Sequence, residues 1–421
     1  MRLFIDGHND TMMRILDRET RLPLVDLGGE TDFHIDLAKL RQGGLNSPSF
    51  AAFSEGYYDG QQDIERSLDE TLSLINGLYF TESKNREDFR IVADSQELLE
   101  NFRAGRISAL ATIEGAYFID RHNYREILAQ LKDLKIRMIG FNWNYSNYLG
   151  EGAAEHYSDK KTPSQGGLTE LGAKVLAEME ELGLAIDVSH MNERTFWGVV
   201  ENTKNPIIAS HSGAYELRPH RRNLKDDQLR AIKESGGLVG LVLCNSFLTD
   251  DGQASLRDYM DHLNYIVDLI GVDHVGIGSD LDGTTLPVDL KDASELGKLV
   301  ELLEEDYGPE DLDKILGGNY LRIFKKLDEG RKTRDLDLEV QLDYEMGQLI
   351  GPGRRLKIVL PKEDLAVRLI LDGIEMEYFI SEERELEVEF DLDTEANFHV
   401  LTVEIEEAGL VSRKTRILYF Q

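Results

Sequence analysis

Eight short runs of apolar, β-branched residues, spaced along the first 280 positions, constrain the fold of this chain most strongly. They are Leu3–Asp10, Leu45–Phe53, Ile107–Gly115, Ile136–Trp143, Leu184–His190, Ile207–Ser212, Leu238–Cys244 and His274–Asp280. Most are continuously apolar, which is typical of strands covered on both faces in a parallel sheet. Segments with helical spacing separate them, most clearly Leu168–Leu182 and Leu256–Ile270, each followed by a glycine. This alternation predicts an α/β fold, a (β/α)8 barrel of the TIM type.

An open, doubly wound sheet is the other fold that alternating strands and helices can form. When such a sheet binds a dinucleotide, its first strand leads into Gly-x-Gly-x-x-Gly, and no such motif follows Leu3–Asp10. We therefore favour the barrel. A chain of 421 residues is long enough for this barrel and an accessory unit.

The sequence pattern changes near Arg331. Beyond this point the candidate strands are short or alternate in polarity, and turn signals such as Asp372-Gly373 separate them. These strands are Leu356–Leu360, Leu365–Leu371, Glu385–Phe390 and Phe398–Glu404. We predict a barrel over residues 1–330 and a small antiparallel β domain over residues 331–421. Of the ten histidines only His399 lies in the second part, so we expect the chemistry in the barrel.

Composition excludes some classes of protein. The net charge is −32 and is spread along the chain, which argues against electrostatic binding to nucleic acid or to an anionic membrane. The one cysteine, Cys244, cannot form an internal disulfide, and its apolar surroundings predict a buried thiol rather than a nucleophile. We find no signal-like segment and no apolar run near twenty residues. The sequence therefore predicts a soluble, cytoplasmic protein.

Side chains that bind metal ions end five of the eight predicted strands. They are His8 with Asp10, then Glu114, His190, His211, and Asp280 with Asp282. The C-terminal ends of parallel barrel strands meet at one face, and residues two apart on a strand share a side. A single histidine such as His190 is more often a hydrogen-bonded residue than a metal ligand. The joint occurrence of these residues predicts a metal centre.

This donor set suits a dinuclear site for zinc or a similar ion. Two cations a few ångströms apart repel each other, so one carboxylate must bridge them, and Glu114 is the central candidate. A hydroxide shared by two metals forms at neutral pH and is a strong nucleophile. Asp280 could take its proton and later pass it to a leaving amine.

These residues lie in segments that resemble the membrane dipeptidase (renal dipeptidase) family, dinuclear zinc peptidases of the amidohydrolase superfamily. The matching segments occur in family order across residues 1–328: Asp6-Gly7-His8-Asn9-Asp10, Ile113-Glu114-Gly115, Asp187-Val188-Ser189-His190, Ser210-His211-Ser212-Gly213-Ala214, Arg221-Arg222-Asn223 and Gly278-Ser279-Asp280-Leu281-Asp282-Gly283. Each segment is modest evidence alone, and together they are highly specific.

The resemblance implies a role for each matching position. His8 and Asp10 would bind one zinc ion, His190 and His211 the second, and Glu114 would bridge the two. Arg222 matches the arginine that binds the substrate's α-carboxylate, for which a guanidinium fork is well suited. Asp280 matches the general acid and base, with Asp282 as the alternative. Because family members often dimerise, the resemblance also suggests a homodimer.

One position departs from the family pattern. After the fourth strand many members carry a histidine that polarises the scissile carbonyl or binds the substrate, and Trp143 takes its place here. Either zinc alone stabilises the oxyanion, or a neighbour such as Asn144, Tyr145 or His156 contributes, or the substrate range is shifted. We transfer the role of that histidine to no residue.

The leading hypothesis is therefore a dinuclear-metal dipeptidase with a dipeptide as its small-molecule substrate. A second hypothesis keeps this chemistry for acyl-amino acids, cyclic amides or lactams. These substrates differ in whether they present a free carboxylate to Arg222. A third is a non-catalytic barrel that serves as a binding scaffold, and it would be favoured by a missing ligand. All five proposed metal ligands are present in the sequence.

Overall fold

Eight parallel strands close into a barrel in the computed structural model, which describes residues 2–58, 61–153, 166–330, 340–344, 346, 349–350, 355–389 and 396–420. In their order around the barrel they are β1 (Ile5–Asn9), β2 (Ser47–Phe53), β6 (Ile107–Glu114), β7 (Ile136–Gly140), β8 (Ala185–Asp187), β9 (Ile208–Ser212), β10 (Leu238–Leu241) and β11 (Val275–Ile277). Pairing of β11 with β1 and of β2 with β6 closes the ring. Each predicted run contains one of these strands, so the predicted barrel is confirmed.

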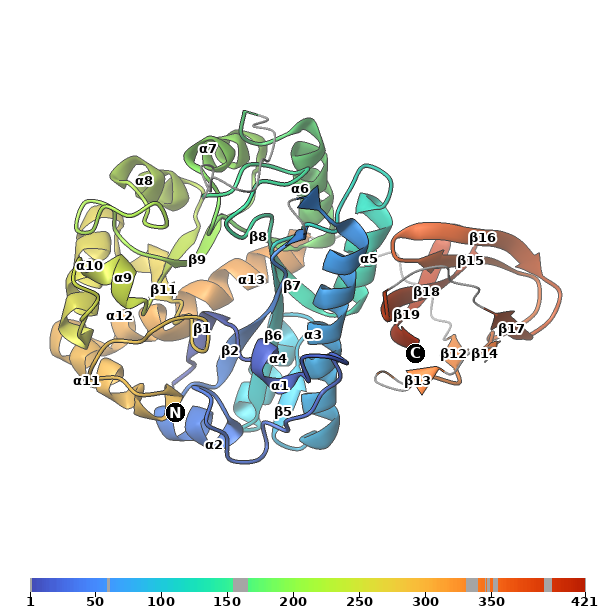
Figure 1. The fold of residues 1–421 in the computed structure, drawn as a ribbon, viewed down its shortest axis with the longest axis horizontal. Helices are drawn as coiled ribbons and strands as arrows, with labels where there is room; N and C mark the ends of the chain where they lie inside the picture. The colour runs from blue at the N-terminus through green and yellow to red at the C-terminus, as the bar shows by residue number, and fades with distance from the viewer. Residues whose placement is uncertain are drawn as a thin grey trace.

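Helices surround the barrel (Figure 1). The outer helices are α2 (Leu37–Gly43), α3 (Ile64–Lys84), α5 (Tyr124–Asp133), α6 (Glu170–Leu182), α7 (Glu193–Asn202), α8 (Asp226–Glu234), α10 (Leu256–Ile270), α11 (Gly297–Asp306) and α13 (Asn319–Gly330). Shorter elements are α1 (Met12–Ile15), β3 (Tyr57–Tyr58), β4 (Gln61–Gln62), β5 (Phe89–Ile91), α4 (Ser95–Arg103), α9 (Asn245–Leu248) and α12 (Pro309–Asp313). The predicted helix at 168–182 begins at Glu170, because the Thr169 side chain accepts the Gly172 N–H as its cap, and it ends before Gly183 at φ +66°.

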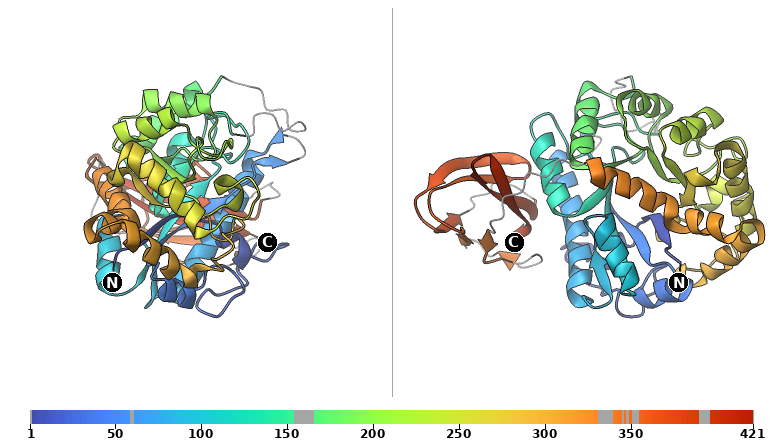
Figure 2. Two further views of the ribbon diagram at one scale, coloured as in Figure 1. Left: turned by 90° about the vertical axis from the view of Figure 1, so that its left-hand side faces the viewer. Right: turned by 180° about the vertical axis from the view of Figure 1, so that it is seen from behind.

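The helix α13 covers one end of the barrel and crosses in front of the strands in the view from behind (Figure 2, right). Tyr320 of this helix donates a hydrogen bond to the Ile277 carbonyl at 3.2 Å. A Cβ atom at Gly7 or at Gly240 would overlap the Tyr320 hydroxyl, so these two strands need glycine there. The helix also packs on Ile5 near the start of β1. The C-terminal ends of the strands are thereby left as the end that carries a site.

The C-terminal part forms two further sheets. One contains β12 (Gln341–Leu342), β14 (Arg355–Val359) and β17 (Glu385–Glu389), in that order. The other contains β13 (Leu349–Ile350), β19 (Leu410–Phe420), β18 (Phe398–Glu407), β15 (Leu365–Leu371) and β16 (Ile374–Ser381). All their pairings are antiparallel except that of β13 with β19, and a separate apolar core lies between the sheets. The predicted antiparallel β unit is confirmed. Its predicted start at Arg331 lies outside the described residues and stays a prediction, as does the strand end at Phe390.

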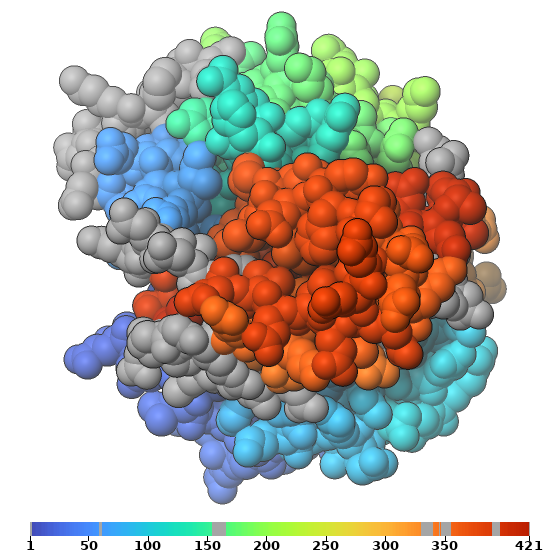
Figure 3. Space-filling model, turned by 90° about the vertical axis from the view of Figure 1, so that its right-hand side faces the viewer, coloured from blue at the N-terminus to red at the C-terminus, as the bar shows by residue number. Residues whose placement is uncertain are grey.

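The larger C-terminal sheet lies against α3 and α5 through β18 and β19, at the side of the barrel (Figures 1 and 3). The buried Gln130 amide of α5 donates to the carbonyls of Ile370 and Val400, both at 3.1 Å, and accepts the Gly373 N–H at 2.8 Å. From α3, the Asp69 carboxylate accepts the N–H groups of Asn397 and Phe398 at 2.8 Å. Across the described parts of the chain, no helix has the length and apolar character needed to span a bilayer.

Candidate active site

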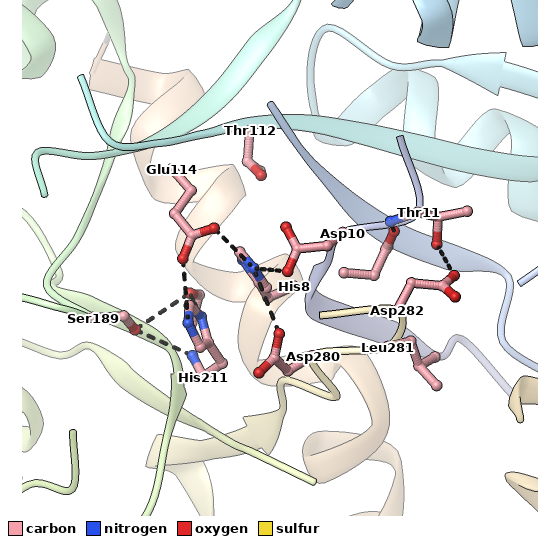
Figure 4. Close-up of polar contacts among 12 residues, drawn as sticks. His8, Asp10, Thr11, Thr112, Glu114, Ser189, His211, Asp280, Leu281 and Asp282 are labelled. Carbon is pink, nitrogen blue, oxygen red and sulfur yellow. Dashed lines mark hydrogen bonds and ion pairs between the residues drawn. The ribbon is translucent and has the colours of Figure 1, made fainter. Parts of the chain in front are cut away.

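His8 and Asp10, at the end of β1, form one half of a polar cluster at the C-terminal end of the barrel (Figure 4). The His8 Nε2 atom lies 3.6 Å from Asp10 Oδ2, 3.6 Å from Glu114 Oε2 and 4.0 Å from Asp280 Oδ1. His8, Asp10 and Glu114 are buried, and the Asp280 side chain is 13% exposed. Among the described residues, neither His8 Nε2 nor Asp10 Oδ1 has a hydrogen-bond partner, although both atoms are buried. Such orphaned atoms are expected where a bound ion completes the site.

The second half contains His190, which follows β8, and His211 of β9. Their Nε2 atoms lie 2.9 Å apart, at 2.8 Å and 3.7 Å respectively from Glu114 Oε1. The His211 ring also stacks on the His8 ring, with centroids 3.9 Å apart. The two oxygens of Glu114 thus face the two halves of the cluster, as a bridging carboxylate would.

Hydrogen bonds fix the tautomers of His190 and His211. The Ser210 hydroxyl donates to Asp187 Oδ2, so it accepts from His211 Nδ1, 2.7 Å away. His190 Nδ1 lies 3.3 Å from Asn144 Oδ1, an oxygen that can only accept. Both Nδ1 atoms therefore carry the proton, and both Nε2 lone pairs point at each other and at Glu114. The two Nε2 atoms and Glu114 Oε1 are all electron-rich and repel one another at this separation. A cation bound between them would turn this repulsion into attraction.

Charge and burial push the ionisable groups of the cluster in opposite directions. Burial alone would lower the pKa of His8, but Glu114, Asp10 and Asp280 outweigh it and raise the value to about 10. Burial, followed by the Asp10 charge, raises the pKa of Asp280 to about 7. Burial likewise holds the pKa of Glu114 well above its ordinary range. These carboxyl groups lack enough positive charge around them, which is the deficit that divalent cations supply.

The backbone around the cluster leaves room for ions. A Cβ atom at Gly283 would overlap Asp10 Oδ2 and Asp280 Oδ1, so glycine keeps the space between these carboxylates open. Ligand atoms of His8, Glu114 and His211 lie within 4.8 Å of one another, and so do those of His8, Asp10 and Asp280. The donor set of imidazole nitrogens and carboxylate oxygens therefore fits divalent metal ions.

Two buried carboxylates beneath the cluster orient its ligands. Asp6 Oδ1 accepts the Ser279 N–H at 2.6 Å, and Asp187 Oδ1 accepts the N–H groups of Ser189 and Ser210 at 2.9 Å. Such second-layer carboxylates hold metal ligands in position. No role was predicted for Asp6 or Asp187 from the sequence. The available signal was an acidic residue two or three positions before a histidine ligand at the end of a strand.

The cluster opens into a cavity of about 380 Å³. Arg222 lines it, and only 5% of this residue is exposed. Arg222 Nη2 donates to the His211 carbonyl at 3.1 Å, whereas Nε has no acceptor among the described residues. A buried guanidinium with unused donors beside a metal cluster is suited to a carboxylate ligand.

Comparison with known proteins agrees with this geometry. The family model described as membrane dipeptidase (peptidase family M19) matches residues 2–336. The dipeptidase aclJ of Aspergillus oryzae is 32% identical over 340 residues, which cover 76% of each chain. An uncharacterized protein of the pqqA 5′ region of Klebsiella pneumoniae is 39% identical over 236 residues, or 54% of this chain and 86% of that relative.

The chain belongs to the membrane dipeptidase family. Its fold matches the crystal structure of a Rhodobacter sphaeroides metallopeptidase bound to a phosphinate mimic of L-Ala-D-Ala, with a TM-score of 0.68 and 28% identity. That match covers 77% of this chain and 99% of the other. Dipeptidase AC, a metallopeptidase of family M19, gives the same TM-score at 29% identity, covering 77% of this chain and 98% of the other. The predicted metal-dependent dipeptidase is thus confirmed, and the scaffold hypothesis is not supported.

The geometry of this family member separates Asp280 from its alternative, Asp282. Asp280 points into the cluster, whereas the buried Asp282 side chain accepts from Thr11 Oγ1 at 2.7 Å and from the His34 N–H at 2.8 Å (Figure 4). Asp282 therefore ties together the segments that follow β1 and β11. Both aspartates, like His190, adopt positive φ angles, of +59° at Asp280, +65° at Asp282 and +66° at His190. Strained backbone of this kind is concentrated at functional sites.

Trp143 of this dipeptidase lines the cavity, at the position where the family pattern has histidine. Of its proposed substitutes, Asn144 contacts His190 and Tyr145 packs edge-on against Trp143, whereas His156 lies outside the described residues. Cys244 is buried, as predicted, and it too lines the cavity, which the sequence did not indicate.

Proposed function

We propose that this dipeptidase binds two divalent cations, most simply zinc, and cleaves dipeptides between them and Arg222. His8 and Asp10 would hold one cation, His190 and His211 the other, and Glu114 would bridge both. The observation that carries the proposal is the meeting of the Nε2 atoms of His190 and His211 with Glu114 Oε1, at 2.8 Å and 3.7 Å. When bound, the two cations supply Lewis-acid chemistry, making a water molecule acidic enough to attack at neutral pH and polarising the scissile carbonyl.

Side chains of the protein would bind and orient the substrate and transfer the proton. Arg222 would bind the α-carboxylate and thereby fix the scissile carbonyl over the ligand cluster. Asp280 Oδ1, 4.0 Å from His8 Nε2, would take the proton of the attacking water and give it to the departing amine. A cavity of about 380 Å³ has the size of a small-molecule site and suits a substrate of two residues. Since the bound ligand of the Rhodobacter sphaeroides relative mimics L-Ala-D-Ala, both L and D second residues should be tried.

A related substrate class stays open. Acyl-amino acids share the amide and the free carboxylate of a dipeptide, so Arg222 alone would accept them as well. Cyclic amides and lactams without that carboxylate would leave the buried guanidinium unpaired, which would weaken their binding. The cytoplasmic location, the homodimer and the lack of nucleic-acid or membrane binding stay predictions from the sequence.

Replacing Arg222 by lysine tests the carboxylate assignment. Lysine keeps the charge but loses the two-pronged donor geometry, so we expect kcat/KM for free dipeptides to fall about a hundredfold. Dipeptide amides lack the carboxylate and should be poor substrates of the wild type. Their kcat/KM should therefore fall little further in Arg222→Lys. Steady-state kinetics on both substrate sets measures this. Equal losses on dipeptides and dipeptide amides would show that Arg222 does not bind the carboxylate.

A further inference from the structure

We propose that this dipeptidase selects substrates whose first residue has a bulky apolar side chain, and that Trp143 and Phe53 make this selection. The inference rests on the proposed function, because it assumes a dipeptide in the cavity with its carboxylate at Arg222. It concerns only the N-terminal residue of the dipeptide, which supplies the carbonyl group of the scissile bond.

The cavity has two chemically different sides. Arg221 and Arg222, in the segment after β9, line one side. Met13, Phe53 and Trp143, which follow or end β1, β2 and β7, line the other. In the strand order, β9 and β10 lie across the barrel from β2 and β6. A dipeptide held at Arg222 therefore extends over the ligand cluster and places its first side chain against the apolar side.

Trp143 presents a firmly held aromatic surface. Its ring packs edge-on against Phe53, with centroids 5.2 Å apart, and against Tyr145, with centroids 5.4 Å apart. Its backbone N–H donates to the Tyr117 hydroxyl at 3.1 Å. A fixed indole face loses little freedom when a side chain stacks on it, and aromatic or branched apolar groups make the largest contact.

A second cavity gives this side chain room. It has a volume of about 350 Å³ and shares Met13 and Phe53 with the first. Leu16, Tyr58 and Leu74 contribute apolar surface to it.

Charged side chains also line the second cavity: Asp17, Arg18, Arg21, Glu55, Arg66 and Glu70. Its half-buried Glu70 is already matched by Arg21 at 3.7 Å and by Arg66 at 3.6 Å. A charged first side chain would lose water where it meets the aromatic rings of Trp143 and Phe53, and a very small one would leave that apolar surface unfilled.

The test compares Phe-Ala, Leu-Ala, Gly-Ala and Lys-Ala, each with L- and D-alanine, on the metal-loaded full-length protein. We expect kcat/KM for Phe-Ala to exceed that for Gly-Ala and Lys-Ala by about tenfold or more. In Trp143→Ala the preference should flatten, mainly through a higher KM for Phe-Ala, while Trp143→Phe should restore it. Metal content, measured on each sample, should not change. The matched control is Trp197→Ala, which removes the other tryptophan, on α7 and outside the cavity lining.

A charge placed on the apolar side provides a gain-of-function readout. Met13, half-exposed where the two cavities meet, can be replaced by glutamate. We expect Met13→Glu to raise kcat/KM for Lys-Ala relative to Phe-Ala. Hydrolysis that ignores the first residue, or equal losses on all four substrates in Trp143→Ala, would overturn this inference and leave the dipeptidase function standing. Failure to hydrolyse any dipeptide would overturn the proposed function, and this inference with it.

Discussion

Gly283 is the residue on which the room for metal ions most directly depends. It follows Asp282, whose φ angle is +65°. A Cβ atom added to Gly283 would overlap carboxylate oxygens of both Asp10 and Asp280. These two carboxylates are held from below by strand β1 and by the segment after β11, so neither can move far. A single methyl group at this position should therefore act on the site and leave the barrel intact.

We predict that Gly283→Ala lowers bound metal and activity together, by tenfold or more, without changing the far-ultraviolet circular dichroism spectrum. Elemental analysis and dipeptide hydrolysis on the same sample provide the measurement. Gly297→Ala is the matched control, because a Cβ there, at the start of α11, meets nothing within 4 Å. Normal metal content and activity in Gly283→Ala would show that this space holds no ion.

At the scale of residues, the sequence allowed the clustering of these side chains to be predicted, but not the carboxylates that lie beneath them. His8, Asp10, Glu114, His190 and His211 each end a recognisable apolar run, and parallel strands bring such ends together. Asp6 and Asp187 lie inside the runs, where a carboxylate looks like an interruption of the strand. Only the structure shows that they accept hydrogen bonds from the backbone next to Asp280 and His211.

Among the elements, the barrel strands were predictable because they are buried on both faces and most of them lie in largely apolar runs. Four of the described C-terminal strands, β12, β13, β16 and β19, were not predicted. β19 carries Ser412, Arg413 and Lys414 at its centre, and these polar residues pair with Ile405, Glu404 and Val403 of β18. Arg413 forms ion pairs with Glu404 and Asp133, a helix residue whose proximity no local pattern reveals.

The contact between α5 and the C-terminal sheet gives a prediction at the scale of elements. Gln130→Leu would leave the carbonyls of Ile370 and Val400 and the Gly373 N–H buried without partners. We expect the free energy of unfolding to fall by about 3 kcal/mol, because unsatisfied buried groups pay their full desolvation cost. Chemical denaturation measures this change.

Gln96→Leu is the control, since the exposed Gln96 side chain donates a hydrogen bond to Glu100 on the same helix, α4. Dipeptidase activity at 25 °C should survive in both variants, because Gln130 lies far in the fold from the ligand cluster. A loss of stability no larger in Gln130→Leu than in Gln96→Leu would show that this contact does not hold the C-terminal sheet.

On the scale of the whole molecule, the described residues that line the cavity lie in the barrel and not in the C-terminal strands. The family match ends at residue 336, and the described C-terminal strands lie beside α3 and α5, away from the residues that line the 380 Å³ cavity. Proximity of this kind could not be read from the sequence, because the contacts join residues more than 200 positions apart, such as Gln130 and Ile370. The family match and the candidate metal-binding cluster both lie in the barrel.

Metal titration of the depleted protein tests the central claim most directly. Zinc is added stepwise to metal-free enzyme, and bound metal per chain and dipeptide hydrolysis are measured at each step. Two cations bridged by Glu114 predict that activity rises until two equivalents are bound, and that Glu114→Gln retains neither tight binding nor activity. Full activity at one equivalent or none, or an active Glu114→Gln variant with unchanged metal content, would contradict the two-metal account.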